Sequence, residues 1–260
     1  VSLLKRLLGN KDSEEQQLKK TKNTIHTLKI NGLKAMKIGK YEHALAFFNN
    51  ILELNENDTD AHLYLSQISV QLSDLELAKH HIRKVIELAP NLLEAKFSLI
   101  HIYHLNKEYK EMLTTTTQVI EENPENVAAH YLQGVAYYRL DDSFNAIASL
   151  TRAITVNSYH IDSLYLRAKI LFEMSQYDEA LKDIHQLFER EKDHEDALLI
   201  KGSIEDKMGN AEEAYASYSK IINLNPFNAK AYLQLSKHFI SLHQLEKALP
   251  SFINNEEVQN

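Results

Sequence analysis

Histidine is the residue type in this sequence with the clearest capacity for chemistry, because an imidazole can bind a metal ion or carry a proton. The chain of 260 residues contains thirteen histidines. His101 and His104 lie three residues apart and would share one helix face, a spacing that suits two ligands of one metal ion. A closed zinc site needs four ligands, and the sequence offers no third histidine or suitably placed carboxylate nearby. We therefore expect polar surface histidines here and no metal site.

Other motifs of catalysis and cofactor binding are absent from the sequence. The chain has no cysteine, which excludes disulfides, thiolate metal sites and a cysteine nucleophile. It also has no glycine-rich phosphate loop and no nucleophile elbow. The sequence predicts a protein that is not an enzyme and that holds no cofactor.

Charge and hydropathy narrow the class of partner. The formal net charge is −7, whereas nucleic-acid binding depends on clustered positive charge, so nucleic acid is an unfavourable partner. No apolar run reaches the ~18 residues of a membrane span. The first residues, VSLLKRLLGNK, do not resemble a secretory signal, because Lys5 and Arg6 interrupt the apolar stretch. These features favour a cytoplasmic protein.

The elements that position the side chains come from an internal repeat. Three of the four prolines, at positions 90, 124 and 226, fall in one 34-residue register, and such a period is typical of repeat architectures. We number the positions within a unit as phases, with phase 1 at residue 25. Phase 20 is alanine in six of the seven units, and phase 8 is usually small. The predicted units are 25–58, 59–92, 93–126, 127–160, 161–194, 195–228 and 229–260.

Each unit has the pattern of a helical hairpin. In the fourth unit, apolar or small residues recur with helical spacing at phases 3, 7, 8, 10, 11 and 14, and again at phases 20, 21, 24, 27 and 28. A break around phase 15, at Gly39 and Gly209 for example, separates the two helices. Such a hairpin is too small to bury its own apolar face and must stack on its neighbours. The sequence thus predicts an all-α fold.

These residues resemble the tetratricopeptide repeat family, in which phases 8 and 20 are small, phase 11 is large, phase 17 is Tyr-like, phase 24 is bulky, phase 27 is small or apolar and phase 32 is proline. The fourth unit supplies Gly134, Tyr137, Ala146, Leu150 and Ala153 at the matching positions. The resemblance covers about nine-tenths of the chain and implies a right-handed α-solenoid of antiparallel hairpins whose first helices line the concave side. His62 and His130 take phase 4, where the family has a large flat side chain, and are interpreted as packing residues.

The residues left over from packing lie at phases 2, 5, 9, 12 and 13, away from the packed stripe of each first helix. Six of the seven phase-5 residues are apolar or aromatic, and exposed patches of this kind usually mark a binding surface. The resemblance places them on the concave face. The predicted peptide-binding residues are Leu63, Tyr64, Phe97, His101, Tyr131, Tyr138, Arg139, Tyr165, Lys169 and Phe172.

An alternative for the same aromatic residues is packing between neighbouring repeats, which partly shields phase 5 in a tight solenoid. Two specialised activities of the family are disfavoured. The lysine and asparagine clamp for a terminal carboxylate and the phase-6 asparagine ladder of sugar-transferring members both lack their residues in this sequence.

The third unit departs from the repeat pattern. Ile100 and Met112 replace small residues, and Thr114–Thr117 place branched hydroxyl residues inside a helix, where they are poor choices. We expect the locally weakest stack here, with residues 108–122 less protected from amide exchange than residues 210–224.

The ends lie outside the regular pattern. Residues 1–24 are predicted as an N-terminal amphipathic arm, stopped at Gly9-Asn10, and a lead-in helix that opens with a capping box at Ser13. Three alternatives remain open for the arm: weak contact of residues 1–8 with a membrane surface, packing over the first repeat or a partner, or fraying. Pro250 would kink the last helix or delay its start.

The sequence as a whole predicts a non-catalytic scaffold or adaptor that binds an apolar or aromatic peptide segment of a protein partner in the groove of a single solenoid, residues 25–260. A structural array that self-associates is one alternative. An accessory subunit of a larger enzyme or of a secretion or assembly complex is another.

Overall fold

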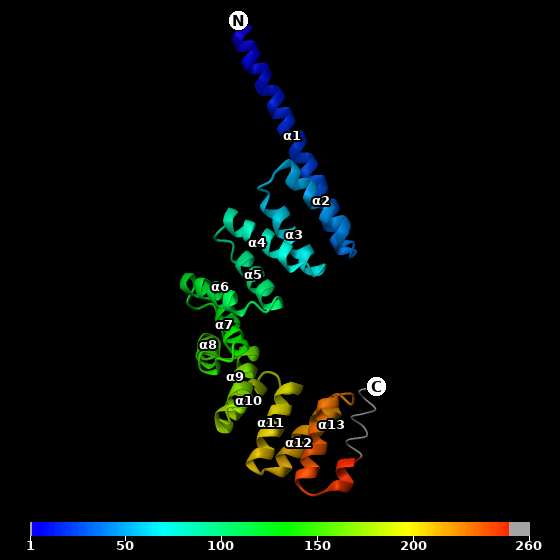
Figure 1. Ribbon diagram of the computed structural model, residues 1–260, viewed down its shortest axis with the longest axis vertical. Helices are drawn as coiled ribbons and strands as arrows, with labels where there is room; N and C mark the ends of the chain where they lie inside the picture. Colours follow the sequence, from blue (N-terminus) through cyan, green and yellow to red (C-terminus); the bar gives the residue numbers. More distant parts are fainter. Residues whose placement is uncertain (1, 250–260) are drawn as a thin grey trace. The chain divides into compact units, whose positions relative to one another are not determined.

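The computed structural model describes the backbone of residues 2–249 and the side chains of residues 15–249. This part of the chain contains the thirteen α-helices named below and a further helical stretch at residues 245–249, and it contains no strand (Figure 1). The helices are α1 (Ser2–Lys37), α2 (Tyr41–Leu54), α3 (Thr59–Gln71), α4 (Leu75–Leu88), α5 (Leu93–Leu105), α6 (Tyr109–Glu122), α7 (Val127–Arg139), α8 (Ser143–Val156), α9 (Ile161–Glu173), α10 (Tyr177–Phe188), α11 (Glu195–Met208), α12 (Ala211–Leu224) and α13 (Ala229–Ser241). Within these residues, no helix has the length and apolarity that crossing a bilayer requires.

The helices follow the 34-residue register. From α3 onward every first helix starts at phase 1, and from α2 onward every second helix starts at phase 17. The side chain just before a helix often accepts a hydrogen bond from the backbone amide three residues later, as Asp58 does from Ala61 and Asn126 does from Ala129, both at 2.9 Å. These caps satisfy amides that have no partner inside the helix and so fix the helix starts.

The turn inside each hairpin uses the left-handed backbone region at phase 15. All seven units have a positive φ there, from 58° at His243 to 83° at Gly209. Only Gly39 and Gly209 are glycines, so five turns force this conformation on residues with a Cβ atom. Hydrogen bonds such as Asp74 N to Ser69 O, 2.8 Å, close the helix end.

Close helix approach depends on phase 8, as the sequence predicted. A Cβ atom on Gly134 would lie 2.7 Å from Leu150 Cγ, and one on Gly202 would lie 2.5 Å from Tyr218 Cε1. In both cases the facing residue is at phase 24 of the same unit. Real Cβ atoms do not approach so closely, so the two helices of these hairpins need glycine at this contact.

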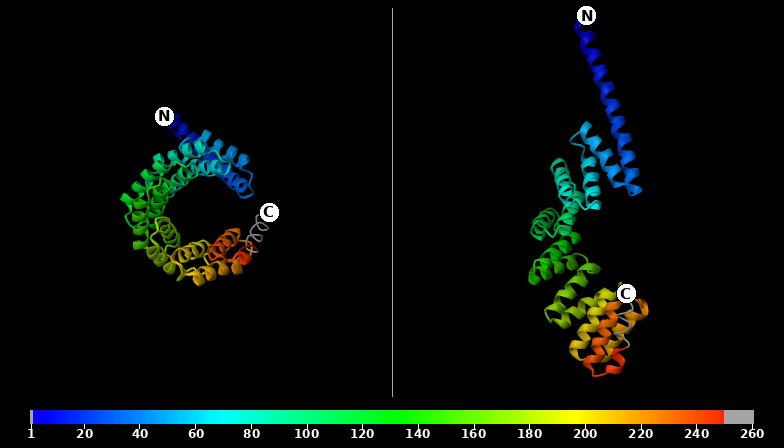
Figure 2. Two further views of the ribbon diagram at one scale, coloured as in Figure 1. Left: turned by 60° about the horizontal axis from the view of Figure 1, so that its bottom comes forward. Right: turned by 45° about the vertical axis from the view of Figure 1, so that its right-hand side comes forward.

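Each first helix packs against its own second helix, and that second helix packs against the next first helix, from α1 to α5 and again from α7 to α13. The phase-20 residues are buried at these contacts, and Ala44, Ala78, Ala146, Ala180 and Ala214 have no exposed surface. The arrangement confirms the predicted fold class, an all-α solenoid of antiparallel helical hairpins (Figure 2).

The first helix is longer than the sequence predicted. α1 continues through Gly9-Asn10 and through Ser13, where the sequence predicted a stop and a new start. A glycine inside a helix costs only ~1 kcal/mol relative to alanine, and the residues on both sides continue the helix. The side chains of the leucine-rich segment 1–8 lie outside the described residues, as do Pro250 and the tail after it.

The chain divides into two compact units, each of which contains several repeats. From here on, the first unit is Val1–Thr115 and the second unit is Thr116–Asn260. The boundary falls inside α6, in the threonine run of the irregular third repeat. Thr114 and Thr115 donate hydrogen bonds to the carbonyls of Lys110 and Glu111, at 3.2 and 3.0 Å. Such bonds back to the preceding turn slightly weaken a helix. The low protection of residues 108–122 stays a prediction for amide exchange.

Candidate peptide-binding surface

The ten residues predicted to bind a peptide all lie on first helices of the repeats, and all are half-buried or exposed. Leu63 and Tyr64 lie on α3, and Phe97 and His101 lie on α5, all in the first unit. The other six lie on α7 and α9 of the second unit. The structure therefore brings the residues together in two groups, one in each unit.

In the first unit, Phe97 and His101 line a cleft of about 390 Å³ between α3 and α5. The cleft also contains Gln67, Val70 and Gln71, which the sequence prediction left out of the site. Their phases, 9, 12 and 13, belong to the set that the helical wheel leaves free of packing. The signal that would have found them was therefore present. The remaining lining residues are Ser66, Glu94, Ser98 and Ile102.

Leu63 and Tyr64 do not line this cleft. The Tyr64 ring stacks on Phe48 with the ring centroids 5.0 Å apart, and it packs against the core that contains Phe48 and Leu65. Tyr64 therefore contributes mainly to packing between repeats, the alternative that the sequence left open for the aromatic residues.

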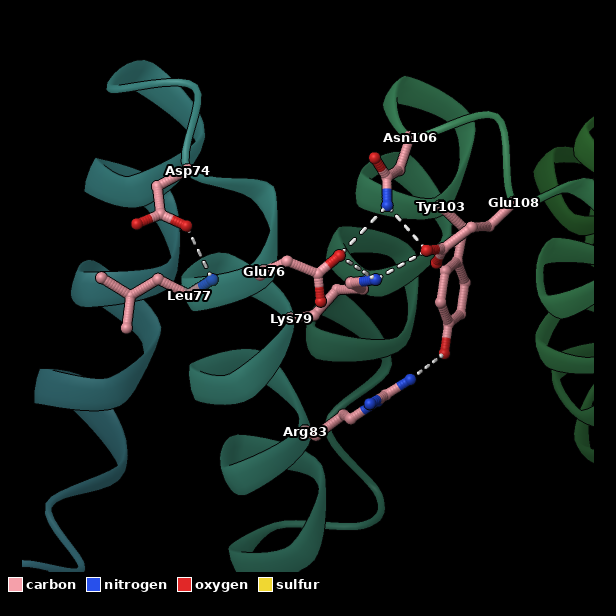
Figure 3. Close-up of polar contacts among 8 residues, drawn as sticks. All are labelled: Asp74, Glu76, Leu77, Lys79, Arg83, Tyr103, Asn106 and Glu108. Carbon is pink, nitrogen blue, oxygen red and sulfur yellow. Dashed lines mark hydrogen bonds and ion pairs between the residues drawn. The ribbon is translucent and has the colours of Figure 1, made fainter.

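A polar network holds α4 against α5 and so fixes one wall of the cleft (Figure 3). Lys79, whose side chain is 8% exposed, contacts Glu76 at 2.7 Å and Glu108 at 2.6 Å. Asn106 donates to the Glu108 carboxylate at 2.6 Å, and Figure 3 shows these groups converging on Lys79. The hydrogen bond and charge of Glu108, with those of Glu76, raise the pKa of Lys79 despite its burial, so this lysine stays charged.

A second cleft of the first unit, about 530 Å³, is polar. Its charged groups balance in number, with three carboxylates and three cations, and Lys79 pairs with Glu76 while Lys84 pairs with Glu87 at 3.0 Å. A cleft whose charges balance and mostly pair offers a ligand little electrostatic gain. The Phe97 cleft, which is mostly apolar, is the better candidate for binding.

In the second unit, Tyr138 of α7 and Lys169 of α9 form a cation–π pair. The Lys169 Nζ atom lies 5.2 Å from the centre of the Tyr138 ring, within the range of this attraction. The Tyr138 hydroxyl donates to Glu173 Oε1 at 2.9 Å. Burial acts to lower the pKa of Lys169, but Tyr138, Tyr165 and Glu173 outweigh it and the net pKa is raised. The surface thus holds a charged ammonium group over the Tyr138 ring, where Tyr165 also acts on its charge.

Tyr131 and Tyr165 occupy phase 5 of successive repeats and have equivalent surroundings. The Tyr131 ring lies against His160 at 5.4 Å, and the Tyr165 ring stacks on His194 at 5.1 Å between centroids. Each histidine precedes the next first helix and accepts a hydrogen bond from that helix's amide. Burial raises the pKa of both tyrosines, and the charges of Asp162 near Tyr131 and Asp196 near Tyr165 add to this. Both rings are half-buried, so each packs on one side and presents the other to solvent.

The last two predicted residues differ in burial. Phe172 packs against the core around Ala168 and Leu171, and its ring centre lies 6.1 Å from that of Tyr177. Arg139 is exposed in the last turn of α7. Phe172 therefore supports the surface from below, whereas Arg139 is free to meet a ligand at its edge.

Charges along the first helices neutralise one another in part. Lys29 of α1 pairs with Asp60 of α3, and Lys230 of α13 lies 3.7 Å from Asp196 of α11. Because neighbouring repeats pair their charges, the aromatic rings and Lys169 dominate the character of this surface in the second unit.

His62 and His130, which the sequence indicated as packing residues, each lie within hydrogen-bond distance of a backbone carbonyl of the preceding repeat. His62 Nε2 lies 2.9 Å from the Glu56 carbonyl oxygen and His130 Nε2 lies 2.8 Å from that of Pro124. Both bonds join phase 4 to phase 32 of the preceding repeat. The two side chains are only 5% and 6% exposed, as expected of packing residues. In the described part of the chain, no three histidine, aspartate or glutamate side chains are grouped to hold a metal ion.

Comparison with known proteins agrees with this architecture. Tetratricopeptide repeat models match residues 60–92 and 165–229, and a model of the anaphase-promoting complex, cyclosome, subunit 3 matches residues 106–186. A TPR repeat-containing protein of Borreliella burgdorferi is 28% identical over 155 residues, which are 52% of this chain and 66% of that protein. A second relative is the Bacillus subtilis TPR repeat-containing protein YpiA, which is 23% identical over 103 residues. These residues are 40% of this chain and 24% of YpiA.

Solved structures show the same fold. A tetratricopeptide repeat protein from Parabacteroides merdae superposes with a TM-score of 0.72 at 16% identity, covering 92% of this chain and 94% of that one. YrrB, described as a TPR protein with an unusual peptide-binding site, gives a TM-score of 0.56 at 23% identity, with 71% and 95% covered. The repeat register, the hairpin geometry and these matches together show that the chain belongs to the tetratricopeptide repeat family.

Proposed function

We propose that this protein is a non-catalytic scaffold or adaptor that binds a protein partner by holding an apolar or aromatic peptide segment along its first helices. Tetratricopeptide repeat proteins are in general interaction scaffolds, and the family matches and structural neighbours are of this kind. The observation that carries the proposal is the half-exposed row of Tyr131, Tyr138 and Tyr165, with charged Lys169 among the rings.

The chemistry of this row selects the kind of ligand. Three half-exposed phenol rings offer large, rigid contact area at a small cost in side-chain entropy, which is why tyrosine is a favoured anchor at interfaces. Phe97 supplies a comparable anchor in the first unit, and Phe172 supports the row. A peptide with an aromatic or aliphatic residue would cover a ring face.

Lys169 and Arg139 would set the orientation of the peptide. Lys169 is charged and partly desolvated, so a carboxylate or backbone carbonyl of the ligand gains more from it than from a fully exposed lysine. Arg139, at the exposed end of α7, would meet an acidic or polar flank. The YrrB structure supports the idea that this fold accommodates a peptide.

The test uses peptides selected from a random library on the wild-type protein and then measured by fluorescence anisotropy. Tyr138→Ala combined with Lys169→Gln should weaken binding by at least 10-fold, because truncating a central aromatic anchor typically costs about 2 kcal/mol. Far-UV circular dichroism verifies that both proteins keep the same helical content.

The matched control is Tyr159→Ala combined with Arg190→Gln. The Arg190 guanidinium lies 4.2 Å from the centre of the Tyr159 ring, so this pair has the same chemistry but lies outside the first helices. The control should keep wild-type affinity. Equal loss in both variants, or selected peptides that bind the Tyr138 variant as well as the wild type, would refute the assignment.

Two other expectations from the sequence stay predictions. Cytoplasmic location is one. Self-association is the other, and sedimentation of the wild-type protein over a range of concentrations tests it directly.

A further inference from the structure

Positive charge in this chain is concentrated at its beginning. Residues 1–40 contain ten lysines or arginines and three acidic residues, so their formal net charge is +7, whereas residues 41–260 have a net charge of −14. A division of this size between parts of one chain indicates a separate interaction for the basic part.

The described portion of the basic segment is almost free of acidic groups. Residues 15–40 contain seven lysines and one acidic residue, Glu15. Lys29 pairs with Asp60. Between residues 15 and 249, no ion pair is observed for the other six lysines, all of which are exposed. These six are Lys19, Lys20, Lys22, Lys34, Lys37 and Lys40.

The lysines share a face of α1 with apolar side chains. At 100° per residue, Lys19, Lys22, Lys34 and Lys37 project from the side opposite to Gly32 and Ala35, the residues packed toward α2. Ile30 and Leu33, 38% and 37% exposed, lie between the lysines on this side. The result is a helix face with exposed aliphatic residues bordered by flexible ammonium groups.

Within the first unit, α1 extends well beyond the helix that it packs against (Figure 1, Figure 2). α2 has 14 residues and α1 has 36, so the partner covers less than half of α1. Residues 15–20 and 22–24 are all exposed. The projecting part thus presents its lysines to solvent.

We propose that the lysine face of α1 docks the protein on an anionic lipid bilayer. Clustered lysines gain ~1 kcal/mol each near such a surface, or about fivefold in partitioning per lysine. The long side chain of lysine can keep its ammonium group among the lipid headgroups. Its aliphatic stem and the neighbouring aliphatic residues then reach the boundary between headgroups and acyl chains.

Residue type favours a lipid surface over other anions. All seven basic residues in 15–40 are lysines, which act as mobile point charges, whereas recognition of a specific carboxylate or phosphate usually uses the planar fork of arginine. The segment contains no phenylalanine, tyrosine or tryptophan, the side chains on which the bases of a single-stranded nucleic acid usually stack. The docking surface extends the weak contact predicted for residues 1–8 to residues 15–40.

The experiment is sedimentation of the full chain with vesicles. Vesicles of phosphatidylcholine with about a third phosphatidylserine should bind the wild-type protein, pure phosphatidylcholine vesicles should not, and raising the salt concentration several-fold should release it. The test variant replaces four lysines with glutamine: Lys19, Lys22, Lys34 and Lys37. Its partitioning should fall by ~100-fold or more, given about fivefold per lysine.

A control variant with the same change in net charge separates the helix from the chain as a whole. It replaces four other exposed lysines with glutamine: Lys107, Lys110, Lys182 and Lys192. This variant should bind within about twofold of the wild type, since its lysines lie outside α1. Equal binding to neutral vesicles, the same loss in both variants, or no binding of the wild-type protein to anionic vesicles would overturn the proposal. The last result would leave an acidic protein surface as the partner of α1.

Discussion

We expect the buried histidine pair of the second repeat to make the stability of this protein depend on pH. His62 Nδ1 and His81 Nδ1 lie 2.9 Å apart, and His62 Nε2 lies 2.9 Å from the Glu56 carbonyl oxygen. Because a carbonyl can only accept, His62 donates from Nε2, which leaves its Nδ1 placed to accept from the His81 N–H. Burial, followed by the nearby His62 and His80, lowers the pKa of His81 from 6.5 to about 4.

The lowered pKa fixes both the sign and the pH range of the effect. Between pH 6.5 and 4 the unfolded chain binds a proton at residue 81 that the folded chain does not bind. The free energy of unfolding therefore falls as the pH falls through this range and levels off below about pH 4. The contribution is ~1 kcal/mol between pH 7.5 and 5.5, ~2 kcal/mol by pH 5, and at most ~3 kcal/mol.

The assay is urea unfolding at pH 7.5, 6.5, 5.5 and 5.0 for the wild-type protein and for His81→Asn. The asparagine amide can still donate to His62 Nδ1 but does not titrate. Glutamates and aspartates begin to titrate in the lower part of this range, and they affect both proteins alike. The difference between the two pH profiles therefore isolates His81. Histidine NMR shifts should place the His81 midpoint near pH 4.

His43→Asn is the control, because His43 is exposed on α2 in the same unit. This variant should keep the full pH dependence of the wild type. The reasoning is wrong if His81→Asn loses stability between pH 7.5 and 5.0 as steeply as the wild type, or if His81 titrates above about pH 6.

Three further predictions concern the repeat itself. Gly134→Val should lower the free energy of unfolding by about 2 kcal/mol or more, since a Cβ would already lie 2.7 Å from Leu150. The control is Ala128→Val, at an exposed position of the same helix, which should cost ~0.5 kcal/mol. If urea unfolding gives the two variants the same stability, the close contact at Gly134 is wrong. Lys107→Gly should raise the melting temperature, because φ is 59° at this residue and glycine relieves ~1 kcal/mol of strain, whereas a lowered melting temperature would show that the turn is not strained. Amide exchange should be faster in residues 108–122 than in residues 210–224, because the threonine hydroxyls bond to helix carbonyls; equal protection by mass spectrometry would place the weak stack elsewhere.

Much of the fold is encoded locally and was predictable from the sequence. Helix starts recur every 34 residues, as the prolines and alanines indicated, because caps such as Asp58 and Asn126 act within three residues. The positive φ at phase 15 and the glycine contact at phase 8 follow from the same short-range pattern. The unbroken course of α1 was not predictable, since a single glycine and a cap-like serine give only weak local signals.

The binding surface depended on packing between helices, which joins residues about 15 to 30 positions apart. The phase positions identified which residues could be left over from packing, but not that Tyr64 packs on Phe48 while Tyr138 receives Lys169 from the next repeat. The cleft between α3 and α5 and the His62–His81 contact arise in the same way. The sequence alone therefore determined the repeat and its faces, because these depend on local backbone preference and helical period. Only the tertiary structure decided which rings are exposed and which charges are paired, because burial and electrostatic contact depend on the distances between helices.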